Sequence, residues 1–106
     1  IKISYILYLI KMSKRIKYTS SNAKDAVWNK AQKIKGLDPK KYRKDPAGNK
    51  LYYSSYGKDT ESGWNIDHIT PKSKGGSNDI RNLQALQTHA NKSYGNNTNK
   101  PSRHNY

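Results

Sequence analysis

The sequence predicts a small α+β domain in which a helix and a short hairpin precede a strand–loop–strand–helix unit. Three observations favour this fold class. Apolar residues recur at helical spacing from Ala23, turn-forming residues at 45–49 precede a short apolar run, and residues 64–69 alternate as a strand should before a Gly-Gly loop. At 106 residues the chain has room for one core of modest size. We therefore expect a single domain.

The domain is expected at residues 20–95, with its strand–loop–strand–helix unit at 63–95 and a polar tail at 96–106. Residues 1–19 form an extension that is apolar first and basic afterwards. Its apolar part, IKISYILYLI, is too short to span a bilayer, which takes ~20 residues. It also lacks the leading charges and the small-residue cleavage site of a signal peptide. We expect a buried or edge strand there and an intracellular protein that is not secreted.

The sequence MSKR, beginning at Met12, resembles a natural start, so the first eleven residues are expected to be an upstream extension. Whether they belong to the native protein stays open.

A helix is predicted after Ser21, because one face collects apolar residues at i, i+4, i+8 and i+11: Ala23, Val27, Ala31 and Ile34. Trp28 widens this face. Ser20 or Ser21 is the expected N-cap, and Gly36 is the expected stop after the last turn.

The remaining elements are short. Asp45 to Asn49 has the turn chemistry that joins two strands, and the second of these is expected at 51–53. A strand follows at 64–69, then a loop in which Gly75 and Gly76 supply positive φ at little steric cost. The returning strand is expected at 80–86. Thr88 then caps a helix of about two turns closed by Gly95, and Ala90 and Tyr94 form its inward face.

Composition restricts both the core and the partner. Hydrophobic content is 32% with no Phe, so we expect Trp28 and Trp64 in the core together with some of the nine Tyr. The absence of Cys excludes disulfides and Cys-based zinc ribbons. A formal net charge of +14 implies a polyanionic partner, most commonly nucleic acid, with an anionic membrane surface as the competing interpretation. Residues 11–50 carry +10 of this charge.

One stretch carries chemistry: GWNIDHITPKSKGGSNDIRNLQALQTHANKSYG, residues 63–95. It places Asp67 and His68 on the first strand, Asn82 on the second and Asn91 on the helix. This order, with fourteen positions from His68 to Asn82 and nine from Asn82 to Asn91, resembles the HNH endonucleases and their ββα-metal core. Upstream VWNKA, YRKDPAGN and YG also look like an extension found before the motif in stand-alone members. The resemblance covers roughly residues 26–95.

The residues themselves suit phosphodiester hydrolysis. That reaction needs a deprotonated water on one side of phosphorus and charge stabilisation where the leaving oxygen departs. Because successive strand side chains point to opposite faces, Asp67 and His68 can address a phosphate from two directions, one through a metal and one as base, if the strand end is twisted or broken by Pro71. Asp67 and Asn91 are hard oxygen ligands, which favours Mg²⁺, with Mn²⁺ as a substitute and zinc disfavoured.

The resemblance assigns roles by position. It implies that Asp67 binds the metal, that His68 is the general base, that Asn82 holds the intervening loop through hydrogen bonds, and that Asn91 completes the metal site. Many family members have His at the position of Asn91, so this chain is an HNN-type variant. The resemblance also implies products with a 3′-hydroxyl and a 5′-phosphate.

Two function classes follow. The first is a metal-dependent endonuclease that cuts DNA by a single-metal mechanism, as a nicking monomer, or as a homodimer or with an accessory protein for double-strand cleavage. The second is a non-catalytic basic nucleic-acid-binding protein on the same fold. Binding is expected mainly through phosphates, and peripheral membrane association is disfavoured. His89 is expected to face away from the site, toward solvent or a phosphate. The candidate phosphate contacts are Lys72, Lys74, Arg81 and Lys92.

Overall fold

The computed structural model describes residues 22–94 and confirms the α+β class. The elements, in chain order, are α2 (Ala23–Lys30), β1 (Tyr42–Lys44), β2 (Lys50–Tyr52), η1 (Tyr53–Ser55), β3 (Trp64–His68), η2 (Lys72–Lys74), η3 (Ile80–Asn82), β4 (Leu83–Gln87) and α3 (Thr88–Tyr94). The expected strand at residues 1–10 and the tail at 96–106 lie outside the described residues. Within residues 22–94, no helix has the length and hydrophobicity needed to cross a membrane.

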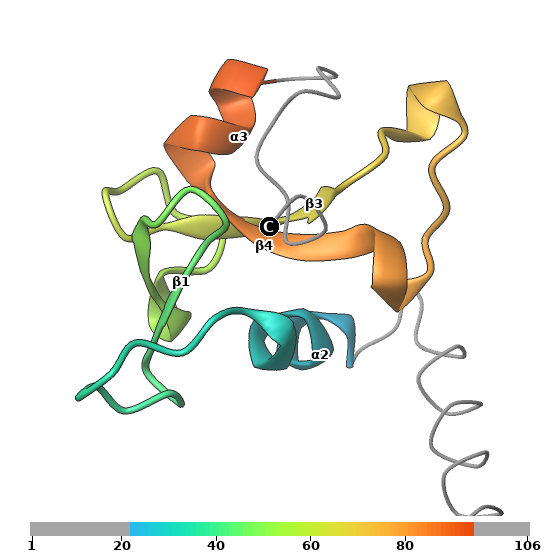
Figure 1. Cartoon of the computed structure of the whole chain (residues 1–106). Coiled ribbons are helices and arrows are strands. Elements are labelled where there is room, and N and C mark those ends of the chain that lie inside the picture. Colours follow the sequence, from blue (N-terminus) through green and yellow to red (C-terminus); the bar gives the residue numbers. More distant parts are fainter. Residues whose placement is uncertain (1–21, 95–106) are drawn as a thin grey trace, which may run out of the picture.

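Two antiparallel two-stranded sheets organise the domain, β1 with β2 and β3 with β4. In Figure 1, α2 lies below the β3–β4 sheet, while α3 leaves the end of β4 and rises above it. The β1–β2 hairpin and the η2 loop stand at opposite ends of that sheet. The sheet thus separates an N-terminal helix on one face from a C-terminal helix on the other.

Helix α2 is shorter than the apolar spacing predicts. It ends at Lys30, and Ala31 is already extended. The reason is tertiary: the buried Arg43 guanidinium donates to the carbonyl of Ala31 at 2.9 Å, and the amide of Lys44 donates to the carbonyl of Gln32 at 2.9 Å. These bonds draw the chain into pairing with β1. Ala31 is buried as predicted, although it belongs to an extended segment and not to the helix.

The two predicted ends of α2 also need correction. Asn22 is the N-cap, and the expected caps Ser20 and Ser21 lie outside the described residues. Gly36 does adopt positive φ (86°), but in a turn closed by a hydrogen bond from the amide of Leu37 to the carbonyl of Ile34. Glycine is therefore needed at a turn beyond the helix, not at its last turn.

The core lies between α2 and the inner face of the β3–β4 sheet. The prediction that Trp28 and Trp64 belong to it is confirmed. Trp64 is fully buried and Trp28 almost so, and their ring centroids lie 5.0 Å apart. Tyr53 and Tyr56 pack edge-on against this pair, at 5.4 Å from Trp28 and 4.7 Å from Trp64 respectively. The indole N–H groups donate to backbone carbonyls, which satisfies their polar edges.

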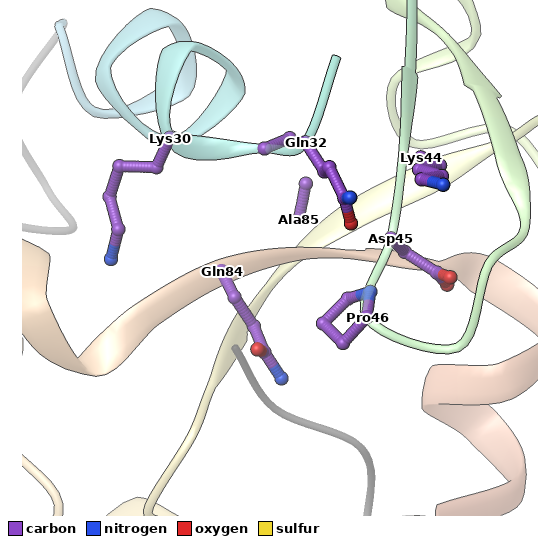
Figure 2. Close-up of a pocket in the computed structure, with 8 residues that line it drawn as sticks. Lys30, Gln32, Lys44, Asp45, Pro46, Gln84 and Ala85 are labelled. Atoms are coloured by element: carbon purple, nitrogen blue, oxygen red, sulfur yellow. The ribbon is translucent and has the colours of Figure 1, made fainter. Parts of the chain in front are cut away.

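The predicted turn at 45–49 is confirmed, and it also joins the hairpin to the second sheet. Asp45 is 1% exposed and accepts from the amides of Ala47, Asn49 and Gln87 and from the side chain of Asn49, all within 3.1 Å. Figure 2 shows this junction, where Ala85 points toward α2 and Gln84 points to the opposite side of β4. The carboxylate of Asp45 thereby fixes the hairpin against the end of β4.

Replacing Asp45 by Ala should lower the free energy of unfolding by about 3 kcal/mol, because four hydrogen bonds lose their buried acceptor at once. Urea denaturation of the two proteins measures this difference. Glu61→Ala is the control, since it removes the same charge from an exposed side chain and should change stability by less than about 0.5 kcal/mol. Equal effects of the two substitutions would contradict the structural role of Asp45.

Candidate functional site

The register of β3 and β4 determines which side chains face each other at the site. Asp67 lies opposite Gln84, and His68 opposite Leu83. Trp64 and Ile66 fill the core, so strand alternation directs Asp67 to the other face of the sheet. That face is the one on the side of α3.

Helix α3 is tied to the outer face of β3 near its start. The side-chain amide of Asn65 donates to the hydroxyl of Thr88 at 3.0 Å, and the amide of Thr88 donates to the carbonyl of Gly63 at 2.9 Å. Asn91 lies on this helix, three residues after Thr88, and is half-buried. Ala90, one of the two residues expected on the inward face, is half-buried too. The side chain of Tyr94, the other, is not among those that the structure describes.

Asp67 is a buried carboxylate held by a buried amide. It is 5% exposed and Gln84 is 1% exposed, and Gln84 Nε2 donates to Asp67 Oδ2 at 2.9 Å. Burial of a carboxylate is costly unless polar groups stabilise it. The amide therefore both stabilises Asp67 and fixes the direction in which the carboxylate points.

His68 ends β3 and is half-buried. Its Nε2 lies 2.8 Å from Oδ1 of Asn78, a residue of the loop between β3 and η3. The imidazole thus has a defined orientation relative to that loop.

Asn82 closes the loop between β3 and β4 at its base. Its Oδ1 accepts from the amide of Thr70 at 2.8 Å, and its Nδ2 donates to the carbonyls of Thr70 at 3.1 Å and Ser77 at 2.8 Å. Its own carbonyl accepts from the amide of Ile69 at 2.8 Å. One side chain thereby binds both ends of the segment from 70 to 77.

The two loop glycines serve different purposes. Gly75 has φ +89°, as predicted, and ends η2. Gly76 does not have the predicted positive φ; instead, a Cβ there would lie 1.7 Å from the carbonyl oxygen of Thr70. Gly76 is required because its backbone packs directly against that of Thr70 and Pro71, and its amide donates to the carbonyl of Pro71.

Lys72 and Lys74 are exposed on η2, within the loop that Asn82 closes. Arg81 follows on η3 and forms a two-pronged contact with Asp79, at 3.0 Å from Nε and 3.2 Å from Nη2. The hydrogen bonds that the Arg81 side chain donates to the Asp79 carboxylate raise the pKa of Arg81 above its usual value. Because 70% of the Arg81 side chain is exposed, this pair directs the guanidinium without burying it.

Lys92 and His89 both contact Asp59, an acid in the loop before β3. Lys92 Nζ lies 3.0 Å from Asp59 Oδ2, and His89 Nε2 lies 2.7 Å from Oδ1. The hydrogen bond from Lys92 is the main cause that lowers the pKa of Asp59. His89 was expected to face solvent or a phosphate; it is largely exposed and has this carboxylate beside it.

The donors available for a metal ion are few. No group of three or more His, Cys, Asp or Glu side chains in residues 22–94 is arranged to hold one. The buried carboxylate of Asp67 and the amide oxygen of Asn91 are each donors of the kind that suits Mg²⁺, which is held by one or two carboxylates and keeps several waters. A zinc site in proteins usually has three or four side-chain ligands, drawn from Cys, His and carboxylates.

Three residues of this region were not predicted from the sequence: Asn78, Gln84 and Asp59. Each contacts a residue that was predicted, namely His68, Asp67 and Lys92 respectively. Gln84 lies opposite Asp67 because of the register of β3 and β4. A sequence signal for the turn at 80–82 would have given this register. Asn78 and Asp59 lie in loops, where spacing alone gives no contact.

Comparison with known proteins supplies one match. Residues 55–97 match the family model described as HNH endonuclease, a segment that begins at the end of η1 and includes β3, β4 and α3. Asp67, His68, Asn82 and Asn91 all fall within it. No curated protein and no solved structure matches the chain.

The close backbone packing at Gly76 gives a stability test. Gly76→Ala should lower the free energy of unfolding by about 2–3 kcal/mol, because the new Cβ forces the backbone of Thr70 away and breaks the loop closure. Gly75→Asn is the matched control and should cost less than about 1 kcal/mol, since Asn tolerates positive φ and nothing lies within 4 Å of a Cβ there. Thermal unfolding of both variants measures the difference. A larger loss in Gly75→Asn would refute the steric explanation.

Proposed function

Because residues 55–97 match the family model described as HNH endonuclease, we propose that the protein is a metal-dependent endonuclease that hydrolyses DNA phosphodiester bonds. The observation that supports this most is the pair at the end of β3. Asp67 and His68 are consecutive, one oriented by Gln84 and the other by Asn78, inside the segment that matches the family. An ordinary surface Asp-His pair has no need of two such partners.

His68 acts as the general base that takes a proton from the attacking water. Its half-buried position at the strand end leaves part of the ring accessible, and the contact with Asn78 limits its rotation. Positioned proton transfer of this kind contributes about 10²- to 10⁴-fold to rate. Asn82 contributes by keeping the loop that carries Asn78 closed against β3 and β4.

Asp67 and Asn91 would hold the Mg²⁺ ion, with Mn²⁺ as a substitute. Such an ion supplies charge stabilisation for the phosphate and the departing oxygen. The chain's own part is to present the Asp67 carboxylate in a fixed direction, which the Gln84 amide does, and to place Asn91 on a helix packed against the same sheet. Two protein ligands leave room for water and a substrate phosphate, so metal binding is expected to strengthen when DNA is present.

DNA is contacted mainly through its phosphates, because the chain carries +14. Lys72 and Lys74 extend from the loop next to His68. Arg81 and Lys92 join them by exchanging their carboxylate partners for phosphate. One site cuts one strand, so a monomer nicks, and double-strand cleavage needs a second copy or an accessory protein.

Supercoiled plasmid incubated with the protein and Mg²⁺ should be converted to nicked circles, and EDTA should prevent it. His68→Ala should cut at least about 100-fold more slowly, because the general base is lost. Agarose-gel time courses measure both. The variant must still retard DNA in a gel shift, which shows that only the chemistry has been removed.

The alternative function, a non-catalytic basic nucleic-acid-binding protein, makes the opposite prediction. It would leave the plasmid supercoiled with the wild-type protein and Mg²⁺ while retarding it in the gel shift. Equal cutting by the wild-type protein and His68→Ala would indicate a contaminating nuclease.

The phosphate contacts have their own test in the salt dependence of DNA binding. Replacing Lys72 and Lys74 by Ala should reduce the slope of log K against log salt concentration by up to about 2, one for each lost phosphate contact. Fluorescence anisotropy over a salt series measures the slope. The matched control replaces Lys50 on β2 and Lys40 just before β1 by Ala. The β1–β2 hairpin lies at the end of the β3–β4 sheet opposite to the η2 loop that carries Lys72 and Lys74 (Figure 1). An equal change in both double variants would indicate diffuse attraction only.

A further inference from the structure

A side chain from the loop after β3 contacts the imidazole of His68. Asn78 Oδ1 lies 2.8 Å from His68 Nε2, and both residues are half-buried. An amide oxygen accepts hydrogen bonds and cannot donate them. The ring nitrogen that faces it must therefore carry the proton, so Nε2–H donates to Asn78.

This contact determines which ring nitrogen carries the proton in the neutral imidazole. A neutral imidazole carries one N–H, so protonation of Nε2 leaves the lone pair on Nδ1. A ring held with the other tautomer would present an N–H to the attacking water and could not accept its proton. The identity of the residue at position 78 thus bears directly on the reaction.

The position of Asn78 is itself fixed by its neighbours in the loop. The carbonyl of Ser77 accepts from Asn82 Nδ2 at 2.8 Å, and the amide of Asp79 donates to the hydroxyl of Ser77 at 3.3 Å. Asp79 in turn is the N-cap of η3 and accepts from the amide of Arg81 at 2.9 Å. Asn78 therefore lies between two residues that are hydrogen-bonded to η3, just before β4.

We propose that Asn78 is a positioning residue, which holds His68 as the Nε2–H tautomer and directs Nδ1 toward the attacking water. The role in catalysis depends on the proposed nuclease function, whereas the tautomer is a property of the protein itself. Asn82 then acts on His68 through this chain of contacts: it closes the loop, the closed loop places Asn78, and Asn78 orients the ring.

The tautomer can be measured on the metal-free, full-length protein without any cleavage. Long-range ¹H–¹⁵N correlation spectra of the His68 ring should show a protonated Nε2 and an unprotonated Nδ1 at a pH where the ring is neutral. In Asn78→Leu, which keeps the size of the side chain but removes the acceptor, both signals should move toward the average of the two tautomers. Asn78→Asp, which keeps an acceptor, should retain the wild-type pattern. A protonated Nδ1 in the wild-type protein overturns the proposal.

The catalytic consequence is measured with the same variants under alkaline conditions. Asn78→Leu should lower kcat for plasmid nicking by about 10- to 100-fold, with KM unchanged within about twofold, because orientation of the base and not DNA binding is lost. Asn78→Asp should recover most of the rate. Asn29→Leu makes the same chemical change on the exposed surface of α2 and should cut like the wild-type protein. Circular dichroism must show all three variants folded.

The two hypotheses fail in different ways. If Asn78→Leu cuts as fast as Asn29→Leu, the positioning role is wrong and the nuclease function stands. If the wild-type protein cuts nothing although His68 shows the Nε2–H tautomer, the nuclease function fails and the catalytic role of Asn78 fails with it.

Discussion

The pairing of β3 with β4 is the constraint on which the site depends. These two short strands carry the core on one face and the buried carboxylate of Asp67 on the other, so a shift of one residue in register would exchange the two sets. Trp64, packed against Trp28 of α2, resists such a shift because its burial requires the inner face. The same register places the Gln84 amide opposite Asp67. Core packing and orientation of the carboxylate are therefore consequences of a single alignment.

The loop between the strands is held by hydrogen bonds of its own side chains and backbone. Asn82 binds both ends of the segment 70–77, and the close backbone packing at Gly76 leaves no room for a side chain. A long flexible loop would leave the ring of His68 without a fixed partner. Here Asn82 closes the loop through its hydrogen bonds, and Asn78 in the same loop contacts His68. Polar side chains thus substitute for the hydrophobic packing that so small a domain cannot provide.

Much of this fold can be predicted from the sequence, because alternation in 64–69, the turn residues at 45–49 and the apolar spacing from Ala23 are local signals. The end of α2 cannot, since Arg43 captures the carbonyl of Ala31 from a distant segment. At the site, Asp67, His68, Asn82 and Asn91 follow from motif spacing. Their partners do not: the η3 turn sets the register of Gln84, and the position of Asn78 depends on how the loop closes.

Two of the candidate phosphate contacts are paired with acidic residues, and this pairing affects how their positive charge is oriented. Arg81 and Lys92 are paired with Asp79 and Asp59, yet their side chains remain 70% and 65% exposed. Exposed ion pairs contribute little to stability, so a phosphate of the proposed DNA substrate would replace the carboxylate at little cost. Until then each pair holds a long side chain in one direction, which reduces the entropy that binding must remove. The acids thus orient two of the basic groups, while Lys72 and Lys74 supply exposed charge on the loop that leads to His68.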